Sequence, residues 1–141
     1  MQKLVENIFM IKELYHSILS PVCSKHNITH TEIMVLLYLA NHPNHTATDI
    51  VENLRFTKSA VSAAARDLQD RDLIRGTFIN GNHRSIHLEL CEAAEEIVKD
   101  GNDAQDMFYS VIVKDFDEDD RHKFKEIVRR ITENINDYHK V

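Results

Sequence analysis

The chain has 141 residues, 43% of them hydrophobic, and a formal net charge of −6 at pH 7. This length allows one domain-sized core together with helices that need a partner to cover them. A dimer would carry 2 × −6 = −12, which argues against indiscriminate attraction to nucleic acid, so any DNA contact must depend on local basic patches.

Three absences in the sequence narrow the class of protein further. No run of eighteen apolar residues occurs, and charged residues stand where a signal peptide would be apolar, so we expect a cytoplasmic protein with no membrane partner. Cys23 and Cys91 lie far apart without a CxxC pair, which predicts free thiols. With three glycines and no phosphate-loop or nucleotide-binding pattern, neither an enzyme nor a bound cofactor is expected.

The first predicted helix is apolar on more sides than one neighbour would cover. Its apolar residues are Leu4, Val5, Ile8, Phe9, Ile11, Tyr15, Ile18 and Leu19. Pro21 removes a backbone donor, so the helix should kink or restart near Ser20 before it ends around Asn27.

The second predicted helix begins with a capping box formed by Thr29 and Glu32, and the residues Asn41-His42-Pro43 end it. Its buried face supports the segment that follows. From residue 46 to residue 90 the sequence then reads as helix, tight turn, helix and two-stranded hairpin, which is a winged helix-turn-helix.

The two short helices of this segment each begin at a threonine. Thr46 with Asp49 three residues later resembles a capping box, and Thr57 is a second N-cap candidate. In the helix after Thr57 the residues predicted to pack inward are Ala60, Val61, Ala64, Ala65 and Leu68. The opposite side carries Lys58, Ser59, Ser62, Ala63 and Arg66. Its alanines keep this helix slender, which suits a DNA groove about 12 Å wide.

The hairpin is predicted from a change of period. Ile86, Leu88 and Leu90 alternate with polar residues, and Asn80-Gly81 supplies the positive φ angles of a tight turn. No acidic residue occurs between residues 76 and 88. The hairpin is therefore locally basic, through Arg75, His83 and Arg84.

Two further helices are predicted after the hairpin. A long one covers residues 93–112, with a weak and kinked middle at Gly101-Asn102. The acids of residues 117–120 suit the positive start of the next helix better than a metal site. The apolar stripe of that helix comprises Phe124, Ile127, Val128, Ile131, Ile135 and Tyr138.

The order of these elements resembles the MarR family of bacterial transcription regulators from end to end. The local matches are Ser59-Ala60-Val61-Ser62, then Leu68, Leu73-Ile74-Arg75, and a wing that ends in His83-Arg84-Ser85. The resemblance implies a mainly α fold with a small two-stranded β-wing. It divides the chain into an N-terminal dimerisation helix (1–28), a winged helix-turn-helix DNA-binding module (29–91), and a linker helix with a C-terminal dimerisation helix (92–141).

The resemblance also implies a homodimer whose interlocked ends hold two recognition helices about 34 Å apart on a palindromic double-stranded DNA operator. Such a regulator would act as a repressor, with its operator binding modulated by a small-molecule effector. The residues expected at the DNA are Thr46, Thr57, Lys58, Ser59, Ser62, Ala63, Arg66, Arg75, His83, Arg84 and Ser85.

Two features depart from the family pattern. Many members have an arginine at the position of Ala63, where a methyl group offers only apolar contact with thymine. The wing tip, residues 80–83, carries His83 in place of several charges, so affinity should be modest and fall as pH rises. Arg84 is the strongest single candidate, because the family's wing arginine enters the minor groove.

The family's effector pocket suggests five lining residues, although aromatic residues at helical spacing also suit a plain core. They are Phe9, Tyr15, His16, Met34 and Tyr38.

Three alternatives remain open. Cys23, His26 and His30 could begin a zinc site, although the region from residue 92 to residue 115 has no histidine. Cys23 could act as a peroxide-sensing thiol. A winged-helix interaction module without DNA binding would account for the acidic balance and for Ala63.

Overall fold

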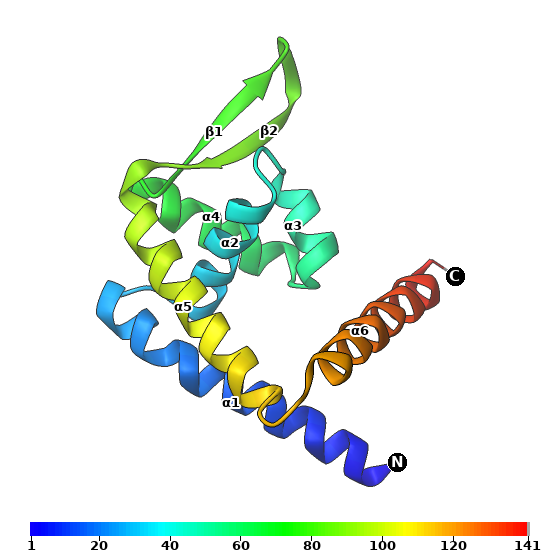
Figure 1. Cartoon of the computed structure of the whole chain (residues 1–141). Helices are drawn as coiled ribbons and strands as arrows, with labels where there is room; N and C mark the ends of the chain where they lie inside the picture. Colours follow the sequence, from blue (N-terminus) through cyan, green and yellow to red (C-terminus); the bar gives the residue numbers. More distant parts are fainter. Residues whose placement is uncertain (141) are drawn as a thin grey trace. The chain divides into compact units, whose positions relative to one another are not determined.

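The computed structural model describes residues 1–140. It contains six α-helices, one short 3-10 helix and one two-stranded antiparallel sheet (Figure 1). The elements are α1 (Gln2–His26), α2 (His30–Asn41), α3 (Ala47–Leu54), α4 (Lys58–Asp70), β1 (Ile74–Ile79), β2 (Asn82–Leu90), η1 (Glu92–Ala94), α5 (Glu95–Ile112) and α6 (Glu118–His139). The predicted winged helix-turn-helix, mainly α with a small β-wing, is confirmed.

The chain forms two compact units, residues 1–108 and residues 109–141. In the first unit α2 is the most deeply buried helix, with Ile33, Val35 and Leu36 fully enclosed. Helices α1 and α4 pack against it, α3 packs against α4, and the sheet extends from this body as a wing (Figure 1). No helix among residues 1–140 has the length and apolar character needed to cross a membrane.

The helix starts follow the predicted capping. Thr29 and Glu32 exchange both hydrogen bonds of a capping box, and so do Thr46 and Asp49. The Thr57 hydroxyl accepts from the backbone N–H of Ala60 at 3.1 Å. These side chains satisfy N–H groups that a helix start leaves without a partner, which is why each helix begins where it does.

The first helix was predicted to kink or restart near Ser20, and no restart occurs. The helix runs through Pro21 without a break and ends at Asn27, which adopts the left-handed conformation of a C-cap. Pro21 has no N–H to donate to the carbonyl oxygen of Ser17. Because Pro21 is exposed, water can donate a hydrogen bond to that oxygen in its place.

The long helix after the wing also differs from the prediction. It begins as a short 3-10 turn, and α5 then continues through Gly101 and Asn102 to Ile112. Gly101 is buried, and a Cβ added there would lie 2.9 Å from the Leu37 Cδ2 atom of α2. This glycine therefore permits close approach of α2 and α5 and does not mark a break.

The wing is a hairpin whose turn has the backbone predicted from Asn80-Gly81. Both residues have positive φ, 53° and 72°, as the turns of two-residue hairpins require. The register pairs Ile74 with Leu90 and Gly76 with Leu88, and it shifts between Thr77 and Ile79. The inner end of the hairpin is buried in the core of the first unit, whereas the tip is exposed.

The end of α4 is fastened to the turn between α1 and α2. The guanidinium of Arg71, which follows α4, donates to the backbone carbonyls of His26 at 2.9 Å and Asn27 at 2.8 Å. Leu68 of the same helix is fully buried. The helix is thus held both by its apolar face and by its last turn.

In the second unit, α6 begins at Asp117, whose carboxylate accepts from the N–H of Asp120 at 2.8 Å. This agrees with the predicted role of these acids as a helix start. No residue of α6, which lies wholly within the described part of the chain, is buried.

Candidate nucleic-acid interface

Helix α4 presents one face to the core and the other to solvent. Val61, Ala64, Ala65 and Leu68 are buried, which agrees with the predicted inward face. The exposed residues include all five predicted for the opposite face: Lys58, Ser59, Ser62, Ala63 and Arg66. Hydroxyl, methyl and cationic groups therefore stand together on a slender exposed surface, a set suited to phosphate and base-edge contacts.

Two hollows border this surface. One of about 340 Å³ lies between α4 and the wing, and Ser62, Arg66 and Ile86 are among the residues that line it. The other, of about 250 Å³, lies between α3 and α4 and is lined by Lys58, Ser62 and Thr48, among others. Ser62 lines both hollows and so stands at the centre of the exposed surface.

Thr46 and Thr57 are placed at the starts of α3 and α4. The Thr46 hydroxyl is committed to Asp49, accepting from its N–H at 3.2 Å and donating to its carboxylate at 3.1 Å. The Thr46 backbone N–H also donates to the Asp49 carboxylate, at 2.8 Å, and this bond first and the one from the hydroxyl second hold the pKa of Asp49 below its usual value. Thr57, Lys58 and Ser59 lie exposed at the first turn of α4, where free N–H groups favour anions.

The wing tip carries an exposed arginine without an acidic partner. Arg84 forms no ion pair with any residue in the described range 1–140, and its backbone N–H donates to the Asn82 side chain at 2.9 Å. Beside it, the His83 ring packs on the half-exposed Phe78 ring with centroids 4.5 Å apart. Ser85 is half-buried in the same strand. The tip thus offers one solvated cation next to an apolar-aromatic edge.

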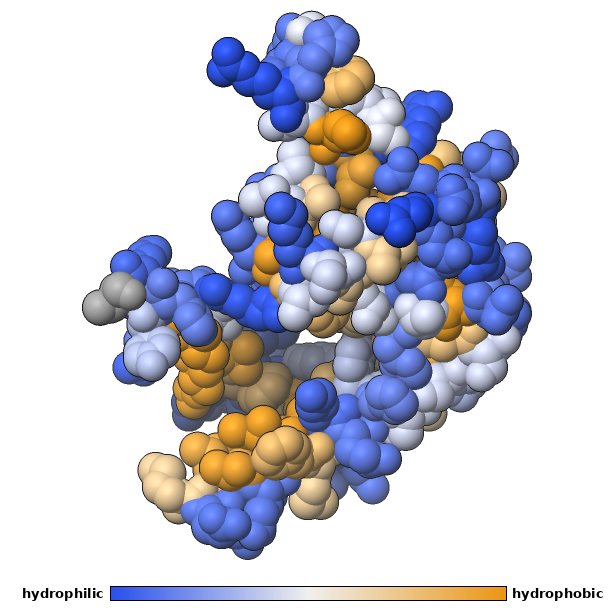
Figure 2. Space-filling model, turned by 180° about the vertical axis from the view of Figure 1, so that it is seen from behind, coloured by the Kyte–Doolittle hydropathy of each residue, from blue (hydrophilic) through white to orange (hydrophobic). Residues whose placement is uncertain are grey.

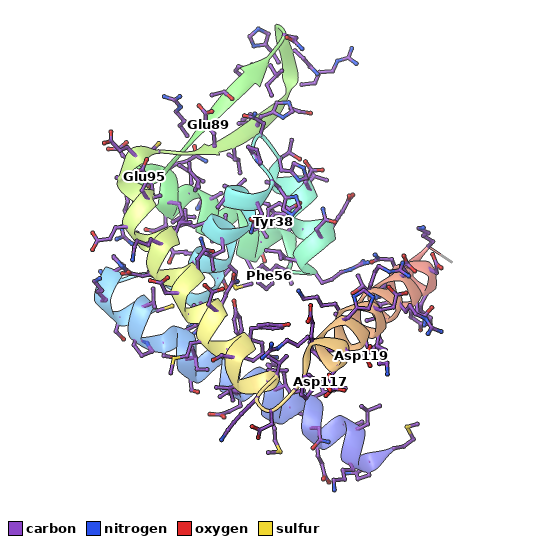
Figure 3. The ribbon with its side chains drawn as sticks, in the orientation of Figure 1. Tyr38, Phe56, Glu89, Glu95, Asp117 and Asp119 are labelled. Atoms are coloured by element: carbon purple, nitrogen blue, oxygen red, sulfur yellow. The ribbon has the colours of Figure 1, made fainter. Side chains whose placement is uncertain are left out.

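Arg75 differs from Arg84, because its guanidinium is bound to Glu89 across the hairpin. That contact raises the pKa of Arg75 above its ordinary value. Figure 3 shows Glu89 on β2 at the base of the wing. The charge of Arg75 is balanced within the protein, so it is less available to a phosphate than sequence reasoning assumed.

Contacts that the sequence did not predict attach the wing to the start of α3. The His87 Nδ1–H donates to the carbonyl of Asn44 at 2.7 Å, and the Leu88 N–H donates to the carbonyl of His45 at 2.9 Å. Thr46 and His87 also form an isolated β-bridge. These pairings join residues more than forty positions apart, and no local sequence pattern signals them.

The five residues expected at an effector pocket are only partly brought together. Met34 and Tyr38 line one hollow of about 170 Å³. The other lining residues, which sequence reasoning missed, are Leu37, Asn41, His42, Leu54 and Gln105. The Tyr15 hydroxyl donates to the Met34 sulfur at 3.1 Å and accepts from the Gln105 amide at 3.0 Å, so Tyr15 supports this wall.

The remaining two lie apart from that hollow. Phe9 is 66% exposed on α1, and the His16 ring stacks on the His30 ring with centroids 3.9 Å apart. Tyr38 is itself largely buried (Figure 3). Its hydroxyl accepts from the Asn53 amide at 2.9 Å and lies 2.7 Å from His45 Nδ1. Burial raises the pKa of Tyr38.

Cys23 does not have the surroundings of a reactive thiol. It is buried, and burial together with the nearby Glu32 carboxylate raises its pKa, so little thiolate forms.

The three residues proposed for a zinc site do not converge. Among residues 1–140 the only three potential ligands whose atoms lie within 4.8 Å of one another are His26, Glu96 and Asp100. The Lys25 ammonium already occupies this cluster, at 2.7 Å from Asp100 and 3.4 Å from Glu96. Lys25 and His26 hold the pKa of Asp100 below its usual range.

Comparison with known proteins points to one group. The model of the MarR family matches residues 26–85, which include α2, α3, α4, β1 and the tip of the wing. The transcriptional regulator AdcR of Streptococcus pyogenes is 29% identical over 101 residues, covering 71% of this chain and 68% of its own length.

Solved structures share the fold. A Listeria monocytogenes protein described as a MarR family transcriptional regulator, solved with a 26mer DNA, has a TM-score of 0.86 and 18% identity, covering 94% of this chain and 89% of that one. Staphylococcus aureus MarR, solved with salicylate and kanamycin, has a TM-score of 0.78 and 21% identity, covering 96% of this chain and 92% of that one. The curated relative and both of these solved structures are described as transcription regulators.

Proposed function

Because this chain belongs to the MarR family of winged helix-turn-helix transcription regulators, we propose that it is a homodimeric repressor that binds a palindromic DNA operator. The observation that carries the proposal is the exposed face of α4, which gathers Ser59, Ser62 and Arg66 on a helix thin enough for the major groove. The unpaired Arg84 of the wing would enter the adjacent minor groove, where narrow A·T-rich segments concentrate negative potential.

The proposed dimer is supported by apolar faces on both terminal helices. Figure 2 shows hydrophobic side chains on the surface of α1 and, separately, of α6. Every residue of this set is at least 43% exposed in the single chain: Leu4, Val5, Ile8, Phe9, Met10, Ile11, Ile127, Val128, Ile131, Ile135 and Tyr138. Apolar surface of this extent is typical of an interface. A second copy of the chain, joined by a two-fold axis, would cover both faces and set the two α4 helices roughly 34 Å apart.

The experiment that tests DNA reading begins with the selection of bound fragments from the source genome. Affinity for the selected operator is then measured for wild type, Arg84→Ala and Arg121→Ala. The Arg84 variant should bind about tenfold more weakly, since a well-placed arginine contributes about 1–3 kcal/mol. Arg121 lies on α6, outside the helix-turn-helix and wing, so its loss should change affinity little. Equal binding by all three proteins would contradict the proposed role of the wing.

Two observations favour a second candidate, a winged-helix module that binds protein and not DNA. Ala63 stands exposed at the middle of α4, where its methyl group offers a base no hydrogen bond, and the chain carries a net charge of −6. Fragment selection that returns no enriched sequence would favour this adaptor.

We further propose that a small lipophilic or aromatic acid modulates operator binding from the hollow lined by Met34, Tyr38 and Gln105. Salicylate is a suitable probe, because a related protein was solved with it. An effector changes binding only if it has different affinities for the two arrangements of the dimer. Salicylate should therefore release the operator from wild type but not from Leu54→Trp, which fills the hollow; release from both would place the effector elsewhere.

A further inference from the structure

Glu32 is the only charged side chain that is buried among residues 1–140, with 6% of its surface exposed. One carboxylate oxygen, Oε1, accepts from the Thr29 backbone N–H at 3.1 Å in the capping box of α2. The other, Oε2, is fully enclosed and faces no hydrogen-bond donor. An ionised carboxylate in this position lacks both solvation and a partner, so its charged form is disfavoured.

The groups that face Glu32 from neighbouring helices are also acidic. Asp67 of α4 lies within hydrogen-bonding reach of Glu32, and the Cys23 thiol of α1 is close enough for the two groups to interact electrostatically. The Arg71 guanidinium donates to the carbonyls of His26 and Asn27. Two ionised carboxylates can only accept hydrogen bonds, so Glu32 and Asp67 can bond to each other only through a proton.

Burial first, and the Asp67 contact second, raise the pKa of Glu32 above its ordinary value. Asp67 is exposed on α4, whereas Glu32 is buried. A proton on Glu32 Oε2 would let this oxygen donate to the Asp67 carboxylate. This arrangement satisfies the enclosed oxygen that otherwise has no partner.

We propose that Glu32 and Asp67 share one proton across the contact between α2 and α4, so that the helix assigned to DNA reading is held by a pH-sensitive hydrogen bond. As pH rises, loss of this proton leaves two carboxylates facing each other and weakens the packing of α4 against α2. The folded state binds the proton more tightly than the unfolded state does. The stabilisation that this proton contributes is therefore fully present below the pKa of Glu32 in the unfolded chain. It is lost as pH rises through the pKa of Glu32 in the folded chain.

The decisive variant is Glu32→Gln, because its amide oxygen can still accept from Thr29 while its NH₂ group donates to Asp67 without any added proton. Urea unfolding of the full chain is measured from about pH 5 to about pH 9 at one protein concentration. The ratio of the wild-type and E32Q folding equilibrium constants should change about tenfold for each unit by which the pKa is raised. The stability of E32Q relative to wild type should therefore increase as pH rises.

Three controls test whether the pH dependence comes from the Glu32–Asp67 pair. All variants retain the nine histidines, whose titration cancels in the ratio. Asp67→Asn should weaken the pH dependence without removing it, since Glu32 remains buried and ionisable while the asparagine amide can donate to its ionised form. Glu52→Gln, an exposed change on α3, should follow wild type. A constant ratio of E32Q to wild type, or an E32Q chain that does not fold at any pH, would overturn the proposal.

The consequence for DNA rests on the proposed function and is measured separately, by fluorescence anisotropy with the selected operator. E32Q should keep more of its affinity than wild type at the alkaline end of the range. A pH-dependent stability ratio without DNA binding at any pH would leave the shared proton intact and refute the proposed function instead. Equal loss of affinity in wild type and E32Q would show that this proton does not influence operator binding by α4.

Discussion

Gly101 shows how one missing side chain sets the distance between two helices. It lies in the middle of α5, where glycine costs about 1 kcal/mol relative to alanine, yet a Cβ there would meet Leu37 at 2.9 Å. Gly101→Ala should therefore destabilise the protein by about 1 kcal/mol, because overpacking a buried leucine outweighs the gain in helix propensity. Urea unfolding measures this difference.

The exposed neighbour Asn102 supplies the control. Asn102→Ala gains helix propensity without a clash and should raise stability by a few tenths of a kcal/mol, on the order of 0.5. In a Leu37→Ala background, Gly101→Ala should reverse sign and become stabilising. If Gly101→Ala stabilises the unmodified chain, the close approach of α2 and α5 is not what requires glycine.

At the scale of an element, α4 depends on the cap at its first turn. The Thr57 hydroxyl accepts from Ala60 N–H at 3.1 Å, so Thr57→Ala should cost about 1 kcal/mol of stability. The same variant should weaken operator binding by more than the loss of one phosphate contact, since Lys58 and Ser59 stand on the turn that would fray. Thr57→Ser keeps the oxygen and should restore both properties; a serine variant as weak as alanine would assign the effect to the threonine methyl group.

Elements of this chain were predictable where a local pattern determines them. The caps at Thr29, Thr46 and Thr57, the Asn80-Gly81 turn and the two faces of α4 all follow from spacing within a few residues. The continuity of α1 through Pro21 was not predictable, because it depends on which side of the helix faces water.

The candidate site was predictable to a smaller degree. The sequence identified Arg75 and Arg84 together, but the cross-strand contact with Glu89 separates a paired arginine from an unpaired one. The hollow at Met34 and Tyr38 required Gln105 from a helix more than sixty residues away. Such pairings depend on register and helix packing, which a single sequence does not display.

At the scale of the whole molecule, the proposed dimer predicts how binding depends on salt. If each subunit makes about three phosphate contacts, the slope of log affinity against log salt should lie near −5 for the dimer. Ile131→Glu places a charge on the apolar stripe of α6 and should yield a monomer with about half that slope. Sedimentation equilibrium and operator titrations at several salt concentrations measure the two effects.

Thr132→Glu is the matched control, because it adds the same charge one residue away from the stripe. It should remain dimeric and keep the full slope. A monomeric wild type, or an Ile131→Glu protein that sediments as a dimer, would contradict the assignment of this face to subunit contact.

The two hydrogen bonds from Arg71 to His26 and Asn27 have a mechanical consequence. They link the C-terminal end of α4 to the C-terminal end of α1, so movements of the two helices are coupled. A rotation of α1 would either move α4 with it or break both hydrogen bonds. If α4 contacts the operator as proposed, Arg71→Ala should uncouple it from α1, and an effector that shifts α1 should then release the operator less effectively.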